Sequence, residues 1–236
     1  MMRVQIRSTL FFIVVAALLV ITACNGDDGN GDLDAGEIVE NAAEAFDETS
    51  TARFELDIDG MIGIDDEGMI QLGAVTGEIA RPASARADAS VQFGGSSVTM
   101  EMIASDGEMF MRNILTGDWE RAPSDLQYDP ARIFDEDEGI ASIIDQLENV
   151  ELIGEDSIDG TDAWRIAGEV DADAVRTLAG DFFESDTLDV DFWVARDDYR
   201  LLRVELHDSE ADDPVSWELS LSEHDEDVEI TPPDLD

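Results

Sequence analysis

The sequence predicts an α+β domain built on one large antiparallel β-sheet that only a few helices cover. Three observations carry this prediction: long runs in which apolar and acidic residues alternate, turn residues between those runs, and only three segments with helical spacing. Alternation with a period of two gives each strand one wet face and one dry face, as antiparallel sheets have. A sheet of about ten or eleven strands tends to curl, so we expect a curved sheet.

The strand pattern begins in residues 54–64, where apolar residues alternate with acidic ones. Further strand-like runs, separated by Gly, Pro or Asp clusters, follow at residues 69–80, 85–94, 96–105, 108–113, 150–157, 162–170, 187–196, 200–208 and 214–223. A short run opens at Trp119 and stops at Pro123, and Asp159-Gly160 is expected to form a tight turn.

Three segments have apolar residues at helical spacing. The first helix is expected to begin near Asp34, which is suited to be its N-cap. The second is expected at residues 139–148, with one apolar stripe made of Ile140, Ile143, Ile144 and Leu147. The third is expected at residues 171–184, with Asp171 or Asp173 as its cap and an apolar side made of Val175, Leu178, Phe182 and Phe183. Residues 124–138 are expected to form an irregular acidic connection.

A sheet with one apolar face must cover that face, and the three expected helices are few for the task. A curled sheet under few helices can leave an apolar hollow. A completely filled core fits the same pattern, so both interpretations stay open at this point.

The first 23 residues have the pattern of an export signal. Arg3 and Arg7 precede an unbroken apolar run, residues 10–20, which is shorter than the about 20 residues of a membrane-spanning helix. The run ends in Ile21-Thr22-Ala23-Cys24, which resembles the lipobox of bacterial lipoproteins. That resemblance implies that Cys24 becomes the N-terminus and carries diacylglyceryl and palmitate groups. The chain would then lie outside the cytoplasm, anchored to the cell membrane by lipid.

Cys24 is the only cysteine, so the domain has no internal disulfide. Residues 24–33 are expected to be the lipidated cysteine and a flexible acidic tether, and a Gly-rich coil of this length spans about 17 Å. Residues 34–236 are then one domain, which we expect to be a monomer.

The net charge is −45, from 58 acidic and 13 basic residues, and all of the basic residues are Arg. Such a chain has no basic patch for nucleic acid, and we interpret the acidity as a solvated outer face. No nucleophile or zinc motif surrounds His207 or His224, so we expect no enzyme, no cofactor and no metal site. The acidic segment 28–37 has some features of a calcium loop, but its sixth position is Leu33 where that loop needs Gly.

Several pieces of the chain, taken in order, resemble the LppX/LprG-type mycobacterial lipoproteins, which share a folding plan with the LolA/LolB lipoprotein carriers. The pieces are the lipobox, the segment 50–56 after the first helix, Met109-Phe110-Met111 followed by Trp119, Asp129-Pro130 followed by Gly139-Ile140, Asp159-Gly160 before the segment 164–170, Phe192-Trp193-Val194 with the segment 201–204, and Pro232-Pro233. The acidity and the absence of Lys depart from the mycobacterial members.

The resemblance implies a half-barrel with helices on its concave side and a cavity that holds acylated lipid or glycolipid for transport across the envelope. The expected cavity residues are the inward members of the strands and the apolar stripe of the second helix: Phe54, Leu56, Ile58, Met100, Met102, Phe110, Ile140, Ile143, Ile144, Leu147, Phe192, Val194, Leu202 and Val204. The alternative hypothesis is a tethered, non-enzymatic module with a filled core that binds a protein or polymer partner.

Overall fold

A computed structural model describes residues 34–59, 62–63, 70–93, 95–105, 107–123, 129–180, 182–209, 211 and 214–235. The predicted export signal, Cys24 and the predicted tether lie outside the described residues, so these three predictions stay predictions. Within the described ranges, no helix is long and apolar enough to cross a membrane.

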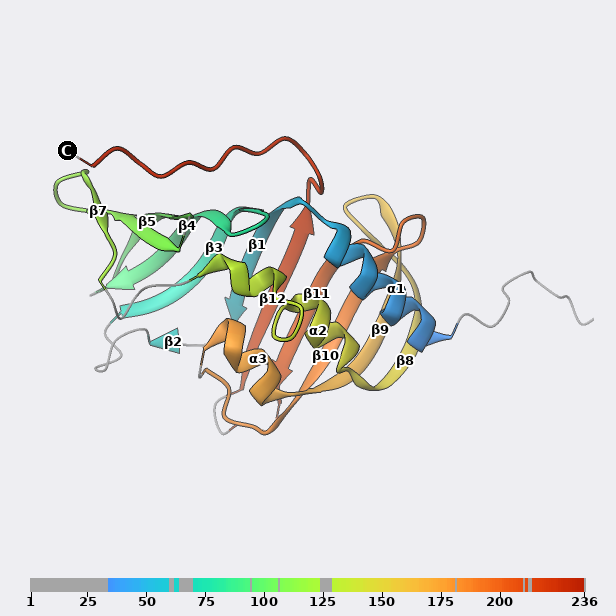
Figure 1. Cartoon of the computed structure of the whole chain (residues 1–236). Coiled ribbons are helices and arrows are strands. Elements are labelled where there is room, and N and C mark those ends of the chain that lie inside the picture. The colour runs from blue at the N-terminus through green and yellow to red at the C-terminus, as the bar shows by residue number, and fades with distance from the viewer. Residues whose placement is uncertain are drawn as a thin grey trace, which may run out of the picture. The chain divides into compact units, whose positions relative to one another are not determined.

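One antiparallel sheet dominates the described domain and confirms the predicted fold class (Figure 1). Its strands are β1 (Thr51–Asp59), β2 (Ile62–Gly63), β3 (Ile70–Ala80), β4 (Ser84–Phe93), β5 (Ser96–Ser105), β6 (Glu108–Arg112), β7 (Trp119–Arg121), β8 (Glu148–Ile158), β9 (Thr161–Asp171), β10 (Thr187–Ala195), β11 (Leu201–Asp208) and β12 (Val215–Ser222). The order across the sheet is β7-β6-β5-β4-β3-β1-β12-β11-β10-β9-β8, and β2 pairs with β3 beside this path. The path does not close into a barrel, because its end strands, β7 and β8, do not pair with each other.

Two meanders meet in the middle of this sheet. The first runs from β1 through β3 to β7, the second runs from β8 to β12, and β1 pairs with β12 at the seam. Within the second meander, Asp159 and Gly160 join β8 to β9 with positive φ angles of 49° and 87°, which confirms the predicted turn. Because β7 and β8 lie at opposite edges, the chain between them must cross the whole sheet.

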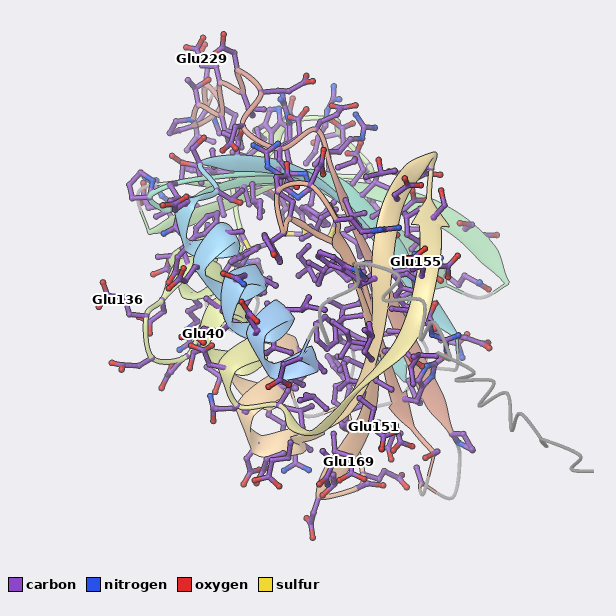
Figure 2. All side chains as sticks on the ribbon, turned by 90° about the vertical axis from the view of Figure 1, so that its right-hand side faces the viewer. Glu40, Glu136, Glu151, Glu155, Glu169 and Glu229 are labelled. Atoms are coloured by element: carbon purple, nitrogen blue, oxygen red, sulfur yellow. The ribbon has the colours of Figure 1, made fainter. Side chains whose placement is uncertain are left out.

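The helices lie on one face of the sheet, and the sheet curves around them (Figures 1 and 2). The crossing connection supplies a short 3-10 helix, η1 (Pro130–Phe134), and α2 (Ile140–Asp145). We expected residues 124–138 to form an irregular connection. This expectation was wrong for the five residues Pro130–Phe134, which form η1. The Asp129 carboxylate accepts a hydrogen bond from the Ala131 N–H at 3.0 Å and so caps η1.

The helix α1 (Ala35–Glu48) begins as predicted, because the Asp34 carboxylate accepts the Gly36 N–H at 3.1 Å. Its buried stripe includes Ile38 and Phe46. The ring of Phe46 stacks on that of Phe134 in η1, with centroids 6.0 Å apart. This contact joins the first helix of the domain to the crossing connection.

The helix α3 (Ala172–Ala179) is shorter than the predicted 171–184. Asp171 caps its start by accepting the Asp173 N–H at 2.8 Å, whereas Gly180, at φ 86°, ends it. Phe182 and Phe183, which the prediction placed on the helix, lie in the segment that follows. The helical spacing in the sequence therefore continued past the real end of the helix.

The outer face of the sheet is charged, and two of the glutamates labelled in Figure 2, Glu151 of β8 and Glu169 of β9, belong to it. Four carboxylates form a row across neighbouring strands, because Asp57 lies opposite Glu218, Glu218 opposite Glu205, and Glu205 opposite Asp191. Arg203 pairs with Glu218 at 3.1 Å and neutralises part of the row. Like charges directly opposite one another destabilise a sheet.

We therefore predict that salt stabilises this domain and that Glu205 accounts for part of the effect. Replacing Glu205→Gln should raise the free energy of unfolding at low ionic strength by about 0.5 kcal/mol and weaken its dependence on NaCl. Urea unfolding at 20 mM and 1 M NaCl measures both quantities. The control is Glu151→Gln, which removes the same charge opposite the uncharged Ala167. An equal response of the two variants would contradict the prediction.

Candidate functional site

A cavity of about 450 Å³ lies between the concave face of the sheet and the elements η1, α2 and α3. Strands from both meanders contribute to its wall, from β6 of the first to β9 of the second. Small-molecule pockets in proteins have volumes of about 300–1,000 Å³, so the volume is in the range of a binding site. Among the described residues, the lining side chains are aliphatic residues, Phe, Met and one Trp, and none of them is charged.

No residue of α1 lines the cavity, because the core under α1 is filled. There Ile38 of α1 and Ile166 and Val194 of the sheet have no exposed surface. The concave face is thus divided into a packed region under α1 and a hollow region under the other helical elements. The sequence left open whether the core is filled or hollow. The filled core describes the region under α1, and the apolar hollow describes the region under η1, α2 and α3.

Short helices and small side chains explain why the second region is hollow. The roof consists of a six-residue helix, an eight-residue helix and η1. Ala85 and Ala104, which are directly paired on β4 and β5, and the nearby Ala87 also line the cavity. These alanines occupy little of the space between sheet and roof, so the dense packing that is normal for a core is not reached.

The cavity brings together nine of the residues that the sequence suggested. They come from two strands of the first meander, two of the second, and the α2 segment: Phe54, Leu56, Met102, Ile140, Ile143, Ile144, Leu147, Phe192 and Val204. The structure places these nine side chains in the cavity wall. Their contact with lipid stays a prediction.

Three suggested residues lie on the inward face but beside the cavity. Met100 comes two residues before Met102 on the same face of β5, opposite the buried Ala89. Ile58 packs against the core opposite Trp217. Val194 belongs to the filled region under α1. Alternation identified their face correctly, but it carries no information on how far the cavity extends along a strand.

Two suggested residues do not face the cavity. On β6 the cavity residue is Met109, so its neighbour Phe110 points to the opposite face, where the Arg121 guanidinium lies 5.8 Å from its ring centre. On β11 the pairing shifts, because Val194 lies opposite Leu201 whereas Phe192 lies opposite Val204. This irregularity makes Leu201 the buried residue in place of Leu202.

Sequence reasoning missed many cavity residues. Most of them lie on β3, β4, β9, β12 and α3, from which the sequence suggested no cavity residue: Leu72, Val75, Ile79, Ala85, Ala87, Ala104, Met109, Ile133, Val170, Val175, Leu178, Ala179, Phe182, Val190, Leu206, Trp217, Leu219 and Leu221. Strict alternation from Phe192 and Val204 would have found Val190 and Leu206. No sequence signal identifies Ile133, because the apolar residues around it have neither helical nor strand spacing.

A family model described as "LppX_LprAFG lipoprotein" matches residues 34–230, which is most of the chain. The chain belongs to the LppX_LprAFG lipoprotein family. This confirms the resemblance that the ordered sequence pieces indicated.

Individual relatives agree with this assignment. The lipoarabinomannan carrier protein LprG of Mycobacterium tuberculosis (strain ATCC 25618 / H37Rv) is 25% identical over 231 residues, which are 96% of this chain and 94% of that protein. The crystal structure of LprF from Mycobacterium bovis superposes with a TM-score of 0.66 at 18% identity, over 84% of this chain and 96% of that one. That of LppX from Mycobacterium tuberculosis gives 0.61 at 14% identity, over 84% and 98%. The two structures share the fold of this family member.

One group of possible metal ligands occurs among the described residues, on the outer face away from the cavity. It consists of Asp191, Glu205 and His207, whose ligand atoms lie within 4.8 Å of one another. Arg165 already donates to the Asp191 carboxylate at 3.0 Å. The other histidine, His224, lies 3.1 Å through its Nε2 from the Leu201 carbonyl oxygen. The cluster gives no reason to change the expectation of no metal site.

A buried carboxylate fixes the segment that carries the cavity residue Phe182 and the buried Phe183. Asp208, which is 1% exposed, accepts the Glu184 N–H at 2.7 Å, and also the Ser185 N–H and hydroxyl. The segment it holds contains Phe182 and Phe183. Burial alone would raise the pKa of Asp208, but these hydrogen bonds outweigh burial and hold the pKa below its ordinary value.

We predict that Asp208 stabilises the fold when it is ionised. A carboxylate with a depressed folded-state pKa contributes stability above its unfolded pKa of about 3.9, and that stability is lost as the pH falls through the folded pKa. Asp208→Asn should therefore lower the free energy of unfolding at pH 7 by about 1–3 kcal/mol. The difference from the parent chain should shrink towards pH 3, as urea unfolding at several pH values will show.

The control for this experiment is Asp189→Asn, which removes the same charge from an exposed position that the Ser209 hydroxyl contacts at 2.6 Å. Its effect should be small at both pH values. A loss at pH 7 that is equal for the two variants would refute the role of Asp208.

Proposed function

We propose that this chain is a lipid-anchored extracytoplasmic lipoprotein that binds acylated lipid or glycolipid in its cavity and carries it across the cell envelope. The single observation behind the proposal is the uncharged apolar cavity of about 450 Å³. Removing one CH₂ group from water is worth about 0.8 kcal/mol, so a long acyl chain crosses water only with a dry container around it. The cavity is suited to be that container.

The relatives support a lipid with a polar head. The LprG proteins are named carriers of lipoarabinomannan, and they match this chain over nearly its whole length. In a complex of this kind the acyl chains would occupy the apolar cavity, whereas a glycan would stay in water. The alternative, a non-enzymatic module with a filled core for a protein or polymer partner, is not favoured by the hollow region.

The anchor completes the proposal. Cys24 at the end of the lipobox-like segment would hold the domain by lipid, and a tether of about 17 Å would keep the cavity near the membrane surface. The family membership is consistent with an extracytoplasmic, membrane-associated protein.

We predict that Cys24→Ser abolishes the anchor. The variant should leave the membrane fraction and appear in the soluble extracytoplasmic fraction, with lipid labelling lost, because a serine hydroxyl cannot form the thioether. Radioactive palmitate incorporation and membrane fractionation measure this. A variant that stays membrane-bound and labelled would rule out Cys24 as the lipidation site.

Blocking the cavity tests the lipid itself. Ile143→Trp places a bulky ring in the wall, and it should reduce co-purifying lipid and the uptake of a labelled acyl probe by about tenfold or more. Its stability should stay within about 1 kcal/mol of the parent chain, whereas the same change in a filled core costs about 1–3 kcal/mol. Mass spectrometry of the organic extract from residues 25–236, probe binding and urea unfolding give the three readings.

The matched control is Met100→Trp, which introduces the same ring on the same face of the sheet but beside the cavity. This variant should keep its lipid. The absence of lipid from the parent chain, together with no probe uptake, would overturn the proposed function.

A further inference from the structure

The volume of the cavity limits how much lipid it can hold. A methylene group in a close-packed interior occupies about 27 Å³. The cavity of about 450 Å³ therefore has room for about 17 such groups. This is the volume of one acyl chain of ordinary length, whereas two chains of about 16 carbons each need about 900 Å³.

The sheet side of the cavity is closely packed. Ile79 of β3, Val170 of β9 and Phe192 of β10 line the cavity, yet they are only 2%, 1% and 1% exposed. Side chains beside a wide chamber would present much more of their surface to it. Such low exposure on three separate strands indicates a narrow space, which accommodates a single chain more readily than several chains side by side.

The roof of the cavity is held together by its own hydrogen bonds. Between η1 and α2, the Asp135 carboxylate accepts the Asp137 and Glu138 N–H groups at 2.9 Å each. The Gly139 N–H donates to the Asp135 carbonyl oxygen at 3.0 Å. The space beside Gly139 is too small for a Cβ, which would meet the carbonyl oxygens of Asp135 and Ile133. Because η1 and α2 form one tightly folded piece, the cavity widens only if these contacts break.

A lipid with a second acyl chain would have to leave that chain in water. When such a lipid is drawn from a bilayer, each CH₂ group that stays in water lowers the amount extracted by about fourfold. A lipid whose only chain fits the cavity has no such cost, because its chain moves from one apolar environment to another. The limited volume therefore discriminates between lipids by the number of their chains.

We propose that the cavity takes up one acyl chain of about 16–18 carbons and that the ligand of this protein is a lipid with a single acyl chain. The inference rests on the proposed function, because it requires acyl lipid in the cavity, and it narrows the class of that lipid. The head group stays outside, since the described lining residues have no charged side chain to receive it.

Extraction from vesicles compares lipids with one and two chains. Phosphatidylcholine vesicles carry equal small amounts of radiolabelled 1-palmitoylglycerol and 1,2-dipalmitoylglycerol, and delipidated protein, residues 25–236, is added until equilibrium is reached. The protein should take up the one-chain lipid at least tenfold more than the two-chain lipid. Equal uptake of the two lipids would overturn the inference and leave the proposed function intact, whereas uptake of neither lipid would refute the proposed function.

The length of the chain gives a second measurement. Saturated 1-monoacylglycerols of increasing length compete with a fluorescent acyl probe for the delipidated parent protein. Their affinity should rise about fourfold with each added CH₂ group and stop rising at about 16–18 carbons, where the cavity is full. An affinity that goes on rising to about 24 carbons would overturn the inference, because the cavity would then hold more than one ordinary chain.

A variant of the wall connects this limit to the cavity. Ala87→Leu adds three carbons to the wall on β4, so it should lower the limiting chain length by about three carbons. The matched control is Ala45→Leu, which adds the same side chain to α1, a helix that does not line the cavity, and it should leave the limit unchanged. An unchanged limit in folded Ala87→Leu would overturn the inference. If Ala87→Leu does not fold, the length series of the parent protein decides.

Discussion

The path of the chain from one edge of the sheet to the other is the constraint on which the rest of the structure depends. Because β1 pairs with β12 in the middle, β7 and β8 lie at opposite edges, and the connection must pass over one whole face. The described part of this connection contains the short helical pieces η1 and α2. The Arg81 guanidinium, 4.4 Å from the ring centre of Phe134, and the Phe46 ring fix this roof to the end of β3 and to α1. A roof assembled in this way covers the sheet without filling the space beneath it.

The same sheet separates two very different surfaces. Alternation along the strands places acids such as Glu205 and Glu218 on the outside and Val204 and Leu219 towards the cavity. A net charge of −45 is therefore compatible with a wall whose described residues have no charged side chain. An interior of this kind accepts neutral apolar matter and rejects ions, and the charge outside keeps the domain in water.

The features that the sequence predicted correctly are local. The strands follow from alternation, and the caps at Asp34 and Asp171 follow from side chains that reach their own helix starts. The error at Phe110 arose because three consecutive apolar residues, Met109 to Met111, do not reveal which of them faces inward. The error at Leu202 has another cause, since the irregular pairing of β10 with β11 exchanges its place with Leu201. Such pairing depends on two distant strands, and neither strand alone encodes it.

The cavity could not be predicted from the spacing of apolar residues. Its volume is the difference between the space enclosed by sheet and helices and the volume of the side chains that fill this space. Ile143 would look the same in a sequence whether position 87, which also lines the cavity, held Ala or a larger residue. The unpaired indole belongs to the same class of features: Trp217 appears in the sequence as one more inward apolar residue, and only its surroundings show that its N–H meets no acceptor. Apolar area supplies affinity for any chain of suitable length, so it discriminates poorly between lipids.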